Sequence, residues 1–306
     1  MANQRVSKHK RMKRCIATIG FFDGVHKGHL CLIEQLQKNS RALGLDSLIV
    51  TFDRHPRQVL CSDYVPSLLS TLDEKVALLR QTGVDEVRVL SFTPEMASMD
   101  ARTFMRDVLV GELNVGALLM GYDHRFGHDG GSFTDYCMWG KELGIDVLLA
   151  TEFPDSKVSS SVIRKRLSEG DVSAACELLG RPYQLRGVVV GGHHIGHTIG
   201  YPTANLSLPE EKLVPQCGVY AVRVLLPNGR KSGGMLCIGS RPTMNNGENI
   251  SVEVNIFDFS GNIYNKEIML EFVSRLRDQQ AFASVDFLCQ QLAVDEKNAR
   301  MALGMT

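Results

Sequence analysis

Apolar and helical patterns alternate along the first 180 residues or so of the chain. Short apolar runs occupy residues 15–22, 47–52, 84–92, 115–121 and 145–151. Apolar side chains recur at helical spacing in the segments between them, residues 30–44, 70–83, 101–113 and 136–144. Such a rhythm builds a parallel, doubly wound sheet with helices on both faces. We therefore predict an α/β domain whose ligands bind beyond the carboxyl ends of its strands.

The pattern changes near residue 183, where a second domain is predicted to begin. Closely spaced strand patterns follow, with turn residues Asn228 and Gly229 between two of them and Gly261 after another. Only residues 284–303 have helical periodicity in this part. The predicted domains are thus residues 1–182, which are α/β, and residues 183–306, a small antiparallel β-barrel with a terminal helix.

Composition narrows the class of protein. The 306 residues are 44% apolar, and 34 Lys and Arg balance 34 Asp and Glu, so no overall field attracts nucleic acid or an anionic membrane. The basic run 5–14 precedes an apolar run that Thr18, Gly20 and Asp23 interrupt or end, so a secretory signal is not expected. No apolar run is long enough to span a membrane. The balanced charge favours small-molecule partners, and eight scattered cysteines favour a reduced, cytoplasmic setting.

Residues 20–29, GFFDGVHKGH, are the first candidate for chemistry, between an apolar strand and a helix expected just after His29. A phosphate at a helix start meets free backbone N–H groups and the positive end of the helix dipole. The imidazoles of His26 and His29 could donate to oxygens that gain charge during attack at phosphorus. We predict a nucleotide-phosphate site without a P-loop, since GxxxxGK[ST] is absent. A glycine turn with two incidental surface histidines is the alternative.

A second cluster, SSSVIRKR at residues 159–166, places three hydroxyls before a helical pattern with Arg164 in its first turns. This arrangement suits a site that holds the β and γ phosphates of a departing pyrophosphate. An ordinary capped, solvated helix is the alternative. Residues 51–57 (TFDRHPR) and 121–127 (GYDHRFG) each follow a strand and fall where the ligand crevice is expected.

The second domain carries oxygen-bearing side chains in two motifs. In GYPTANL, residues 200–206, Thr203 and Asn205 are two apart and project to one side of an extended segment, where such oxygens suit Mg²⁺ bound to ATP phosphates. In VEVNIFDF, Glu253 and Asn255 alternate with apolar residues. A carboxylate at residue 253 could take a proton from a hydroxyl that attacks the γ-phosphate. The alternatives are ordinary polar residues of an edge strand and a solvent-facing Glu.

Together these motifs resemble, in order and spacing, those of the prokaryotic bifunctional riboflavin kinase/FAD synthetases, over about residues 15–295. The resemblance implies an N-terminal Rossmann-like FMN adenylyltransferase of the HxGH nucleotidyltransferase superfamily and a C-terminal riboflavin kinase. It implies that ATP first phosphorylates riboflavin to FMN and that a second ATP then transfers AMP to FMN, which gives FAD and pyrophosphate. Both steps are expected to need Mg²⁺, and neither involves nucleic acid or a membrane.

The resemblance also implies site residues. Glu253 would be the base of the kinase, and His26 and His29 would act on the ATP phosphates in adenylyl transfer. Thr203 and Asn205 would bind the metal and ATP. Further ATP and phosphate contacts are expected at Gly20, Phe22, Asp23, Gly24, Asp123, Ser159, Ser160, Arg164 and Gly196. Flavin contacts are expected at His55, Pro56 and Arg277.

Departures from the family pattern leave other functions open. His197 replaces a usual Arg, Asn255 a commoner His and Asn265 a usual Gly, and the loop 128–132 looks shortened. One rival is a chain whose N-terminal domain alone is active, as an adenylyl- or cytidylyltransferase, while the barrel binds flavin. Another is a non-catalytic flavin or nucleotide sensor. An aminoacyl-tRNA synthetase is disfavoured, because no KMSKS-type loop or large anticodon domain is present.

Overall fold

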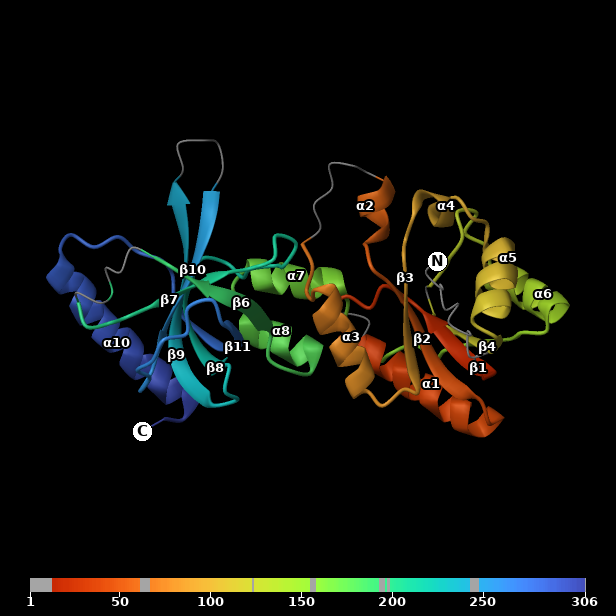
Figure 1. Ribbon diagram of the computed structural model, residues 1–306, viewed down its shortest axis with the longest axis horizontal. Helices are drawn as coiled ribbons and strands as arrows, with labels where there is room; N and C mark the ends of the chain where they lie inside the picture. Colours follow the sequence, from red (N-terminus) through yellow and green to blue (C-terminus); the bar gives the residue numbers. More distant parts are fainter. Residues whose placement is uncertain are drawn as a thin grey trace, which may run out of the picture. The chain divides into compact units, whose positions relative to one another are not determined.

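The chain forms two compact units, Met1–Pro66 with Leu72–Ser156, and Ser67–Thr71 with Lys157–Thr306 (Figure 1). The computed structural model describes residues 13–60, 67–122, 124–154, 158–192, 196, 199–242 and 248–305. The predicted change of domain near residue 183 falls inside the second unit. There α7 (Ser160–Ser168) and α8 (Val172–Leu179) share one apolar core with the strands that follow. As ranges for two activities, 1–182 and 183–306 stay a prediction.

The first unit contains the predicted parallel sheet. Its strands are β1 (Cys15–Ile19), β2 (Asp46–Phe52), β3 (Glu86–Leu90), β4 (Val115–Met120) and β5 (Asp146–Leu149), in the order β3-β2-β1-β4-β5. All neighbouring strands pair in parallel. The central strands β1 and β4 are buried along their whole length, because both of their faces are covered, whereas the edge strands β3 and β5 expose residues. All five predicted strands are confirmed.

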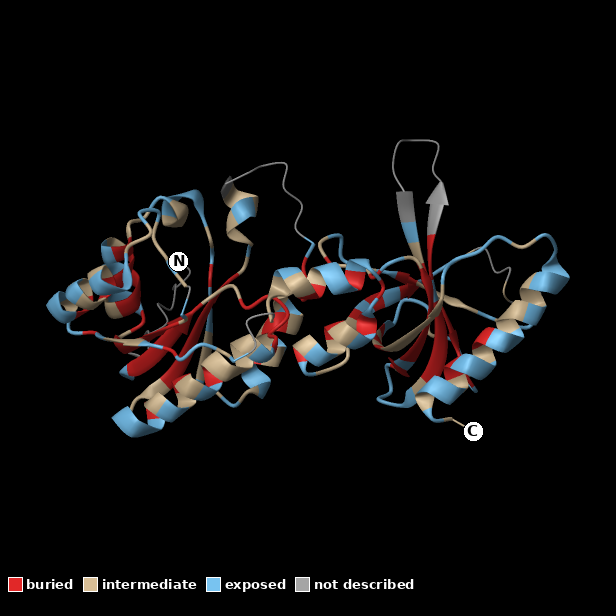
Figure 2. Cartoon of the chain, turned by 180° about the vertical axis from the view of Figure 1, so that it is seen from behind, coloured by how far each residue is buried: buried red, intermediate tan, exposed pale blue. Residues whose placement is uncertain are grey.

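Helices cover both faces of this sheet (Figure 2). On one face α1 (Lys27–Leu43) and α3 (Leu72–Gln81) place Ile33, Leu36 and Leu79 against β1 and β2. The other face packs against α5 (Ala101–Thr103), the π-helix η1 (Phe104–Glu112) and α6 (Phe133–Leu143). The short helices α2 (Pro56–Leu60) and α4 (Pro94–Ala97) follow β2 and β3. The chain changes face between the helix after β1 and the helix after β4, so the ligand crevice is expected between those two strands.

The helix predicted over residues 101–113 is confirmed, but most of it has π-helical rather than α-helical hydrogen bonds. The backbone N–H of Leu113 donates to the carbonyl of Val108, five residues earlier. No helix among the described residues is long and apolar enough to cross a membrane.

The second unit contains a closed antiparallel barrel in the order β10-β7-β6-β11-β8-β9. Its strands are β6 (Gln184–Val190), β7 (Ala204–Ser207), β8 (Gly218–Leu225), β9 (Lys231–Pro242), β10 (Glu248–Ile256) and β11 (Glu267–Arg277). Alternate residues such as Leu185 and Val189 on β6 are buried in the core, as the period of a strand requires. Helix α10 (Val285–Leu303) packs through Ala299 on Val219 and Ala221 of β8. The predicted barrel with a terminal helix is confirmed.

Asn265 explains one departure from the family pattern. Its φ of 58° is in the left-handed region, and its backbone N–H donates to the carbonyl of Val189 at 2.9 Å. Asn visits this region more readily than most other residues that carry a side chain. The turn before β11 is therefore kept without a glycine.

A buried ion pair joins α10 to β11. Asp295, whose side chain is 2% exposed, accepts hydrogen bonds from Nε and Nη2 of Arg277 at 2.7–3.0 Å. The amide of Gln291 donates to the same carboxylate at 2.8 Å. Because the charges are paired and hydrogen-bonded, removal of either one leaves the other without its partner and largely shielded from water.

We expect Asp295→Ala to lower the free energy of unfolding of the second unit by about 3 kcal/mol, because the guanidinium of Arg277, only 20% exposed, loses its carboxylate partner. Glu296→Ala is the matched control on the same helix: Glu296 pairs with Arg300 at 2.9 Å, with side chains 29% and 28% exposed. Its cost should be under about 1 kcal/mol. Urea unfolding followed by circular dichroism measures both. Equal costs for the two variants would contradict the prediction.

Candidate active sites

The loop after β1 has an unusual backbone. Phe22, Gly24 and Val25 have φ of 54°, 75° and 40°, and the N–H of Val25 donates to the carbonyl of Phe22 at 3.1 Å. A β-branched residue such as Val rarely adopts positive φ, and such strain persists only where the surroundings enforce it. Here the side chains of Phe22 and Val25 are buried in the core under α1. The loop of residues 20–29 is therefore held in one shape, as a binding site requires.

His26 and His29 lie together at the start of α1. His26 is the N-cap residue, and its Nδ1 accepts the backbone N–H of His29 at 3.3 Å, which leaves Nε2 to carry the proton of the neutral ring. The two rings stack with centroids 3.6 Å apart, and Phe22 contacts His29 edge-on at 5.1 Å. Both imidazoles thus stand beside the N–H groups of a helix start, where anions bind.

The expected start of this helix, just after His29, is wrong. Helix α1 begins at Lys27, so His29 belongs to its first turn. The physical reason is the cap: an imidazole nitrogen accepts the N–H that Ser, Thr, Asp or Asn accepts in most helices. Because the helix begins at Lys27, the ring of His29 lies in the first turn and stacks on that of His26.

The loop after β2 meets residues 20–29. The ring of His55 contacts Phe21 edge-on with centroids 4.9 Å apart. His55 Nδ1 accepts the N–H of Arg57 at 3.2 Å, and Pro56 begins α2. The structure therefore brings His55 and Pro56, the predicted flavin contacts, beside the predicted phosphate site.

The loop after β4 also approaches α1. A Cβ at Gly121 would lie 3.8 Å from the side chain of Leu32, within van der Waals contact. Asp123, a predicted ATP contact, lies outside the described residues. In the loop 128–132, the N–H of His128 donates to the carbonyl of Met99, and Asp129 accepts the N–H of Ala101 at 3.0 Å. These bonds tie the loop to the start of α5.

The predicted pyrophosphate cluster begins α7 in the second unit. Ser159 is the N-cap and accepts the N–H of Val162 at 3.3 Å, so ordinary capping is part of its role. Ser160 is the first helical residue, and Arg164 donates to the hydroxyl of Ser161 at 3.3 Å. A phosphate grip by Ser159, Ser160 and Arg164 stays a prediction.

A second site forms where β7 meets β10. Glu253 pairs in register with Asn205, and the hydroxyl of Thr203 donates to Glu253 Oε2 at 3.4 Å. A Cβ at Gly192 would collide with the amide of Asn205, so this glycine makes room for the side chain. The structure thus gathers three oxygen-bearing side chains that the sequence places in two distant motifs.

The segment before Thr203 is held by two backbone contacts. Gly196 accepts the N–H of Tyr201 at 2.8 Å, and a Cβ at Gly196 would collide with the carbonyl of Tyr201. His197 lies outside the described residues. Buried Asn255 donates from Nδ2 to the carbonyl of Pro202 at 2.7 Å. Asn255, noted in the sequence only as a departure from the family, is therefore an anchor of the GYPTANL segment.

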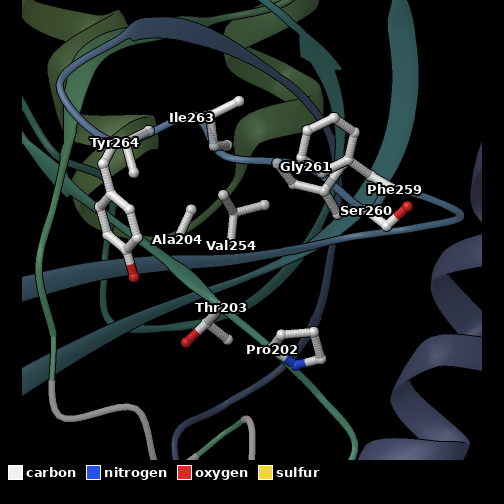
Figure 3. A pocket seen from close by; sticks show the side chains of 11 residues that line it. Pro202, Thr203, Ala204, Val254, Phe259, Ser260, Gly261, Ile263 and Tyr264 are labelled. Carbon is white, nitrogen blue, oxygen red and sulfur yellow. The ribbon is translucent and has the colours of Figure 1, made fainter.

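A cavity of about 290 Å³ opens beside Thr203 (Figure 3). Its walls are mainly apolar, and its lining includes Val189, Ala204, Val254, Ile256, Phe259, Ile263 and Tyr264. Such a pocket suits a flat aromatic ring whose polar end lies at Thr203. Sequence patterns missed Phe259, Ile263 and Tyr264, because an apolar residue after a strand carries no sign of what it contacts.

Arg277, the third predicted flavin contact, is bonded to Asp295 and to the carbonyl of Asp278. Its guanidinium also lies 5.8 Å from the ring centroid of Phe282. Phe282 and Phe287 line a second cavity with Gln291. Arg277 is thus first a structural residue, and its contact with flavin stays a prediction.

Comparisons with known proteins cover both units. Residues 8–162 match the family model described as FAD synthetase, and residues 179–303 match that described as riboflavin kinase. The chain is 34% identical to a crystal structure described as a macrolide-efflux protein from Streptococcus pneumoniae, over 94% of each chain, with a TM-score of 0.86.

Curated relatives cover nearly the same length. The bifunctional riboflavin kinase/FMN adenylyltransferase of Escherichia coli (strain K12) is 37% identical, over 95% of this chain and 94% of the relative. That of Bacillus subtilis (strain 168) is 35% identical, over 94% and 92%. With both domain models matched in order and relatives of this identity along almost its whole length, the chain belongs to the bifunctional riboflavin kinase/FMN adenylyltransferase family.

Proposed function

We propose that this transferase makes FAD from riboflavin in two ATP-dependent steps. The first converts riboflavin and ATP into FMN and ADP in the barrel. The second converts FMN and another ATP into FAD and pyrophosphate in the first unit. The observation that carries the proposal is the meeting of Thr203, Asn205 and Glu253 at one seam of the barrel, because it supplies a base beside a phosphate site. The free state of the seven described cysteines supports a cytoplasmic setting.

Glu253 is the proposed base of the kinase. Its carboxylate accepts the proton of the ribityl 5′-hydroxyl as that oxygen attacks the γ-phosphorus, and ADP leaves. Held on a strand that pairs on both sides, it needs little reorganisation. The cavity beside Thr203 would take the nucleotide base, since the phosphates of that nucleotide must reach Thr203.

Thr203 and Asn205 fit a magnesium ion. Both offer oxygen ligands beside a carboxylate, and hard oxygen donors are what Mg²⁺ binds. When bound, the ion would neutralise charge on the β and γ phosphates. The protein itself would contribute the hydroxyl of Thr203 and the amide oxygen of Asn205, both held beside Glu253.

Adenylyl transfer is assigned to the loop of residues 20–29. An FMN phosphate oxygen attacks the α-phosphorus of ATP, and pyrophosphate leaves. His26 and His29 donate hydrogen bonds to the phosphate oxygens at the start of α1, where Gly20, Phe22, Asp23 and Gly24 shape the loop. We assign a further nucleotide contact to Asp123 and the flavin to His55 and Pro56, while a grip of Ser159, Ser160 and Arg164 on the departing phosphates stays an expectation from the sequence.

We expect Glu253→Gln to reduce kcat for FMN formation by about 100- to 10,000-fold, since the amide cannot accept the proton. Formation of FAD from supplied FMN should be unchanged. Separation of flavins by chromatography measures both. Glu267→Gln is the control, since Glu267 is an exposed residue of β11 paired with Arg186. Normal FMN production by Glu253→Gln would rule out this base.

His29→Ala should lower the rate of FAD formation by about 100-fold or more, because a donor to the charged oxygens is lost. FMN should then accumulate from riboflavin and ATP, which also separates this enzyme from a sensor without turnover. The exposed His128 of the same unit provides the control variant, His128→Ala, with normal FAD synthesis expected. A variant at residue 29 that makes FAD at the normal rate would contradict the assigned site.

Asn255→Leu should raise KM for ATP in the kinase reaction by about tenfold, since loss of the hydrogen bond from its amide to the Pro202 carbonyl costs roughly 0.5–1.5 kcal/mol and frees the segment that carries Thr203. The base at Glu253 stays in place, so kcat should fall less. Asn255→His keeps a ring N–H for the same carbonyl and should stay close to the unaltered enzyme. If both variants behaved alike in steady-state kinetics, this anchor would have no role.

A further inference from the structure

Lys75 of α3 is a buried cation for which no motif accounts. The residue is 2% exposed, and its Nζ donates to the carbonyl of Phe52 at 2.8 Å. The same nitrogen lies 3.9 Å from the ring centroid of Phe21. In the sequence, Lys75 is one more charged residue of a predicted helix, and such residues are usually solvated.

The position of Lys75 links the two loops of the adenylyl-transfer site. Phe21 belongs to the loop after β1, and its carbonyl accepts the hydroxyl of Thr51 at 3.1 Å. The ring of Phe21 also contacts His55, which follows β2. Phe52, whose carbonyl accepts from Lys75, is the last residue of β2. One ammonium therefore holds both the phosphate loop and the end of the strand that leads to His55.

Charge supports the same conclusion. Burial lowers the pKa of Lys75 to about 8, while the carboxylates of Asp23 and Asp53 oppose that shift. Because the folded pKa is below that of the unfolded chain, burial of the ammonium costs stability below pH 8, and this cost disappears as the pH rises from about 8 to 10.5. Burial of this lysine beside the proposed nucleotide site therefore lowers the stability of the fold, a cost that functional sites commonly carry.

We propose that Lys75 is a positioning residue for adenylyl transfer. Its ammonium fixes Phe21 and, through that ring, His55, and its charge offsets Asp23 and Asp53 where a triphosphate binds. Being buried, it acts through these neighbours and does not touch the substrate. This inference rests on the proposed assignment of adenylyl transfer to the loop of residues 20–29.

The test is Lys75→Met, which keeps the length of the side chain and removes its charge. We expect kcat/KM for FAD formation from FMN to fall about 100-fold, the size of effect that a small misplacement of reacting groups produces. FMN formation in the barrel should be unchanged. Trp139, the only tryptophan, lies in α6 of the first unit, so its fluorescence reports the unfolding of that unit. In Lys75→Met, the unfolding temperature of the first unit should equal or exceed that of the unaltered protein.

Lys212→Met is the matched control. Lys212 is 5% exposed, donates to the carbonyl of Leu69 at 2.8 Å and lies 5.0 Å from the ring of Tyr183. It has the same kind of surroundings as Lys75, but in the second unit. FAD formation from FMN should therefore stay within about twofold of the unaltered rate, far from the effect of misplaced reacting groups.

The dependence of FAD formation on pH separates a role of the Lys75 charge in catalysis from a purely structural role, which would not change it. In the unaltered enzyme, kcat/KM for FAD formation should fall above about pH 8, where Lys75 loses its proton, while the kinase reaction on the same chain lacks this fall. Lys75→Arg keeps its charge and should extend FAD formation to higher pH. These measurements decide the question if Lys75→Met does not fold.

Three results would overturn the proposal. The first is FAD formation by Lys75→Met within about threefold of normal, since positioning effects are larger. The second is a loss of activity in Lys75→Met together with a lower unfolding temperature of the first unit, as followed by Trp139 fluorescence. The third is a pH profile that Lys75→Arg leaves unchanged. His29→Ala, run in parallel, separates the two hypotheses: if that variant makes FAD normally, the assigned site itself is wrong.

Discussion

The pairing of β7 with β10 is the contact on which the barrel depends, because it closes the sheet through only two residue pairs, Asn205 with Glu253 and Val254 with Ala204. A closed barrel has no free edge, so the register at this seam is linked to the registers of the other strand pairs. A slip by one residue would turn Glu253 into the core and Val254 out of it. The interaction that completes the fold therefore also sets the distance between the proposed base and the proposed metal ligands. A substitution that disturbs the β7–β10 pairing should therefore affect both the stability of the barrel and the geometry of the proposed kinase site.

The first unit follows a similar logic with different means. Its strands end at one edge of a parallel sheet, and the loop after β1 adopts positive φ at Val25 only because buried contacts hold it there. His26 caps α1 and stacks on His29, and the ammonium of Lys75 contacts the ring of Phe21 in the loop. The side chains of the first site are therefore positioned by local strain, a helix cap and a buried cation, whereas those of the second site are positioned by strand register.

Sequence patterns predicted every strand of the parallel sheet, the barrel with its terminal helix, and the motifs that carry the proposed chemistry. They did so because periodicity reports which side of an element is buried. It does not report the partner. The Asn255 bond to Pro202, the contact of Lys75 with Phe21 and the shared core of α7, α8 and the barrel all join residues far apart in the chain. The early start of α1 was missed for another reason: a histidine cap has no strong propensity signal.

The different side chains at the two sites follow from the two nucleophiles. Riboflavin attacks through an alcohol, whose proton must leave as the bond to phosphorus forms, so the kinase site needs a base, which is the role proposed for Glu253. FMN attacks through a phosphate monoester, whose second pKa is about 6, so its oxygen is already largely ionised at neutral pH. No base is required there, and the site must instead offset the repulsion between two polyanions. On the proposed assignment, this explains why imidazoles, a helix start and a buried lysine gather in the first unit, whereas the barrel places Glu253 beside Thr203.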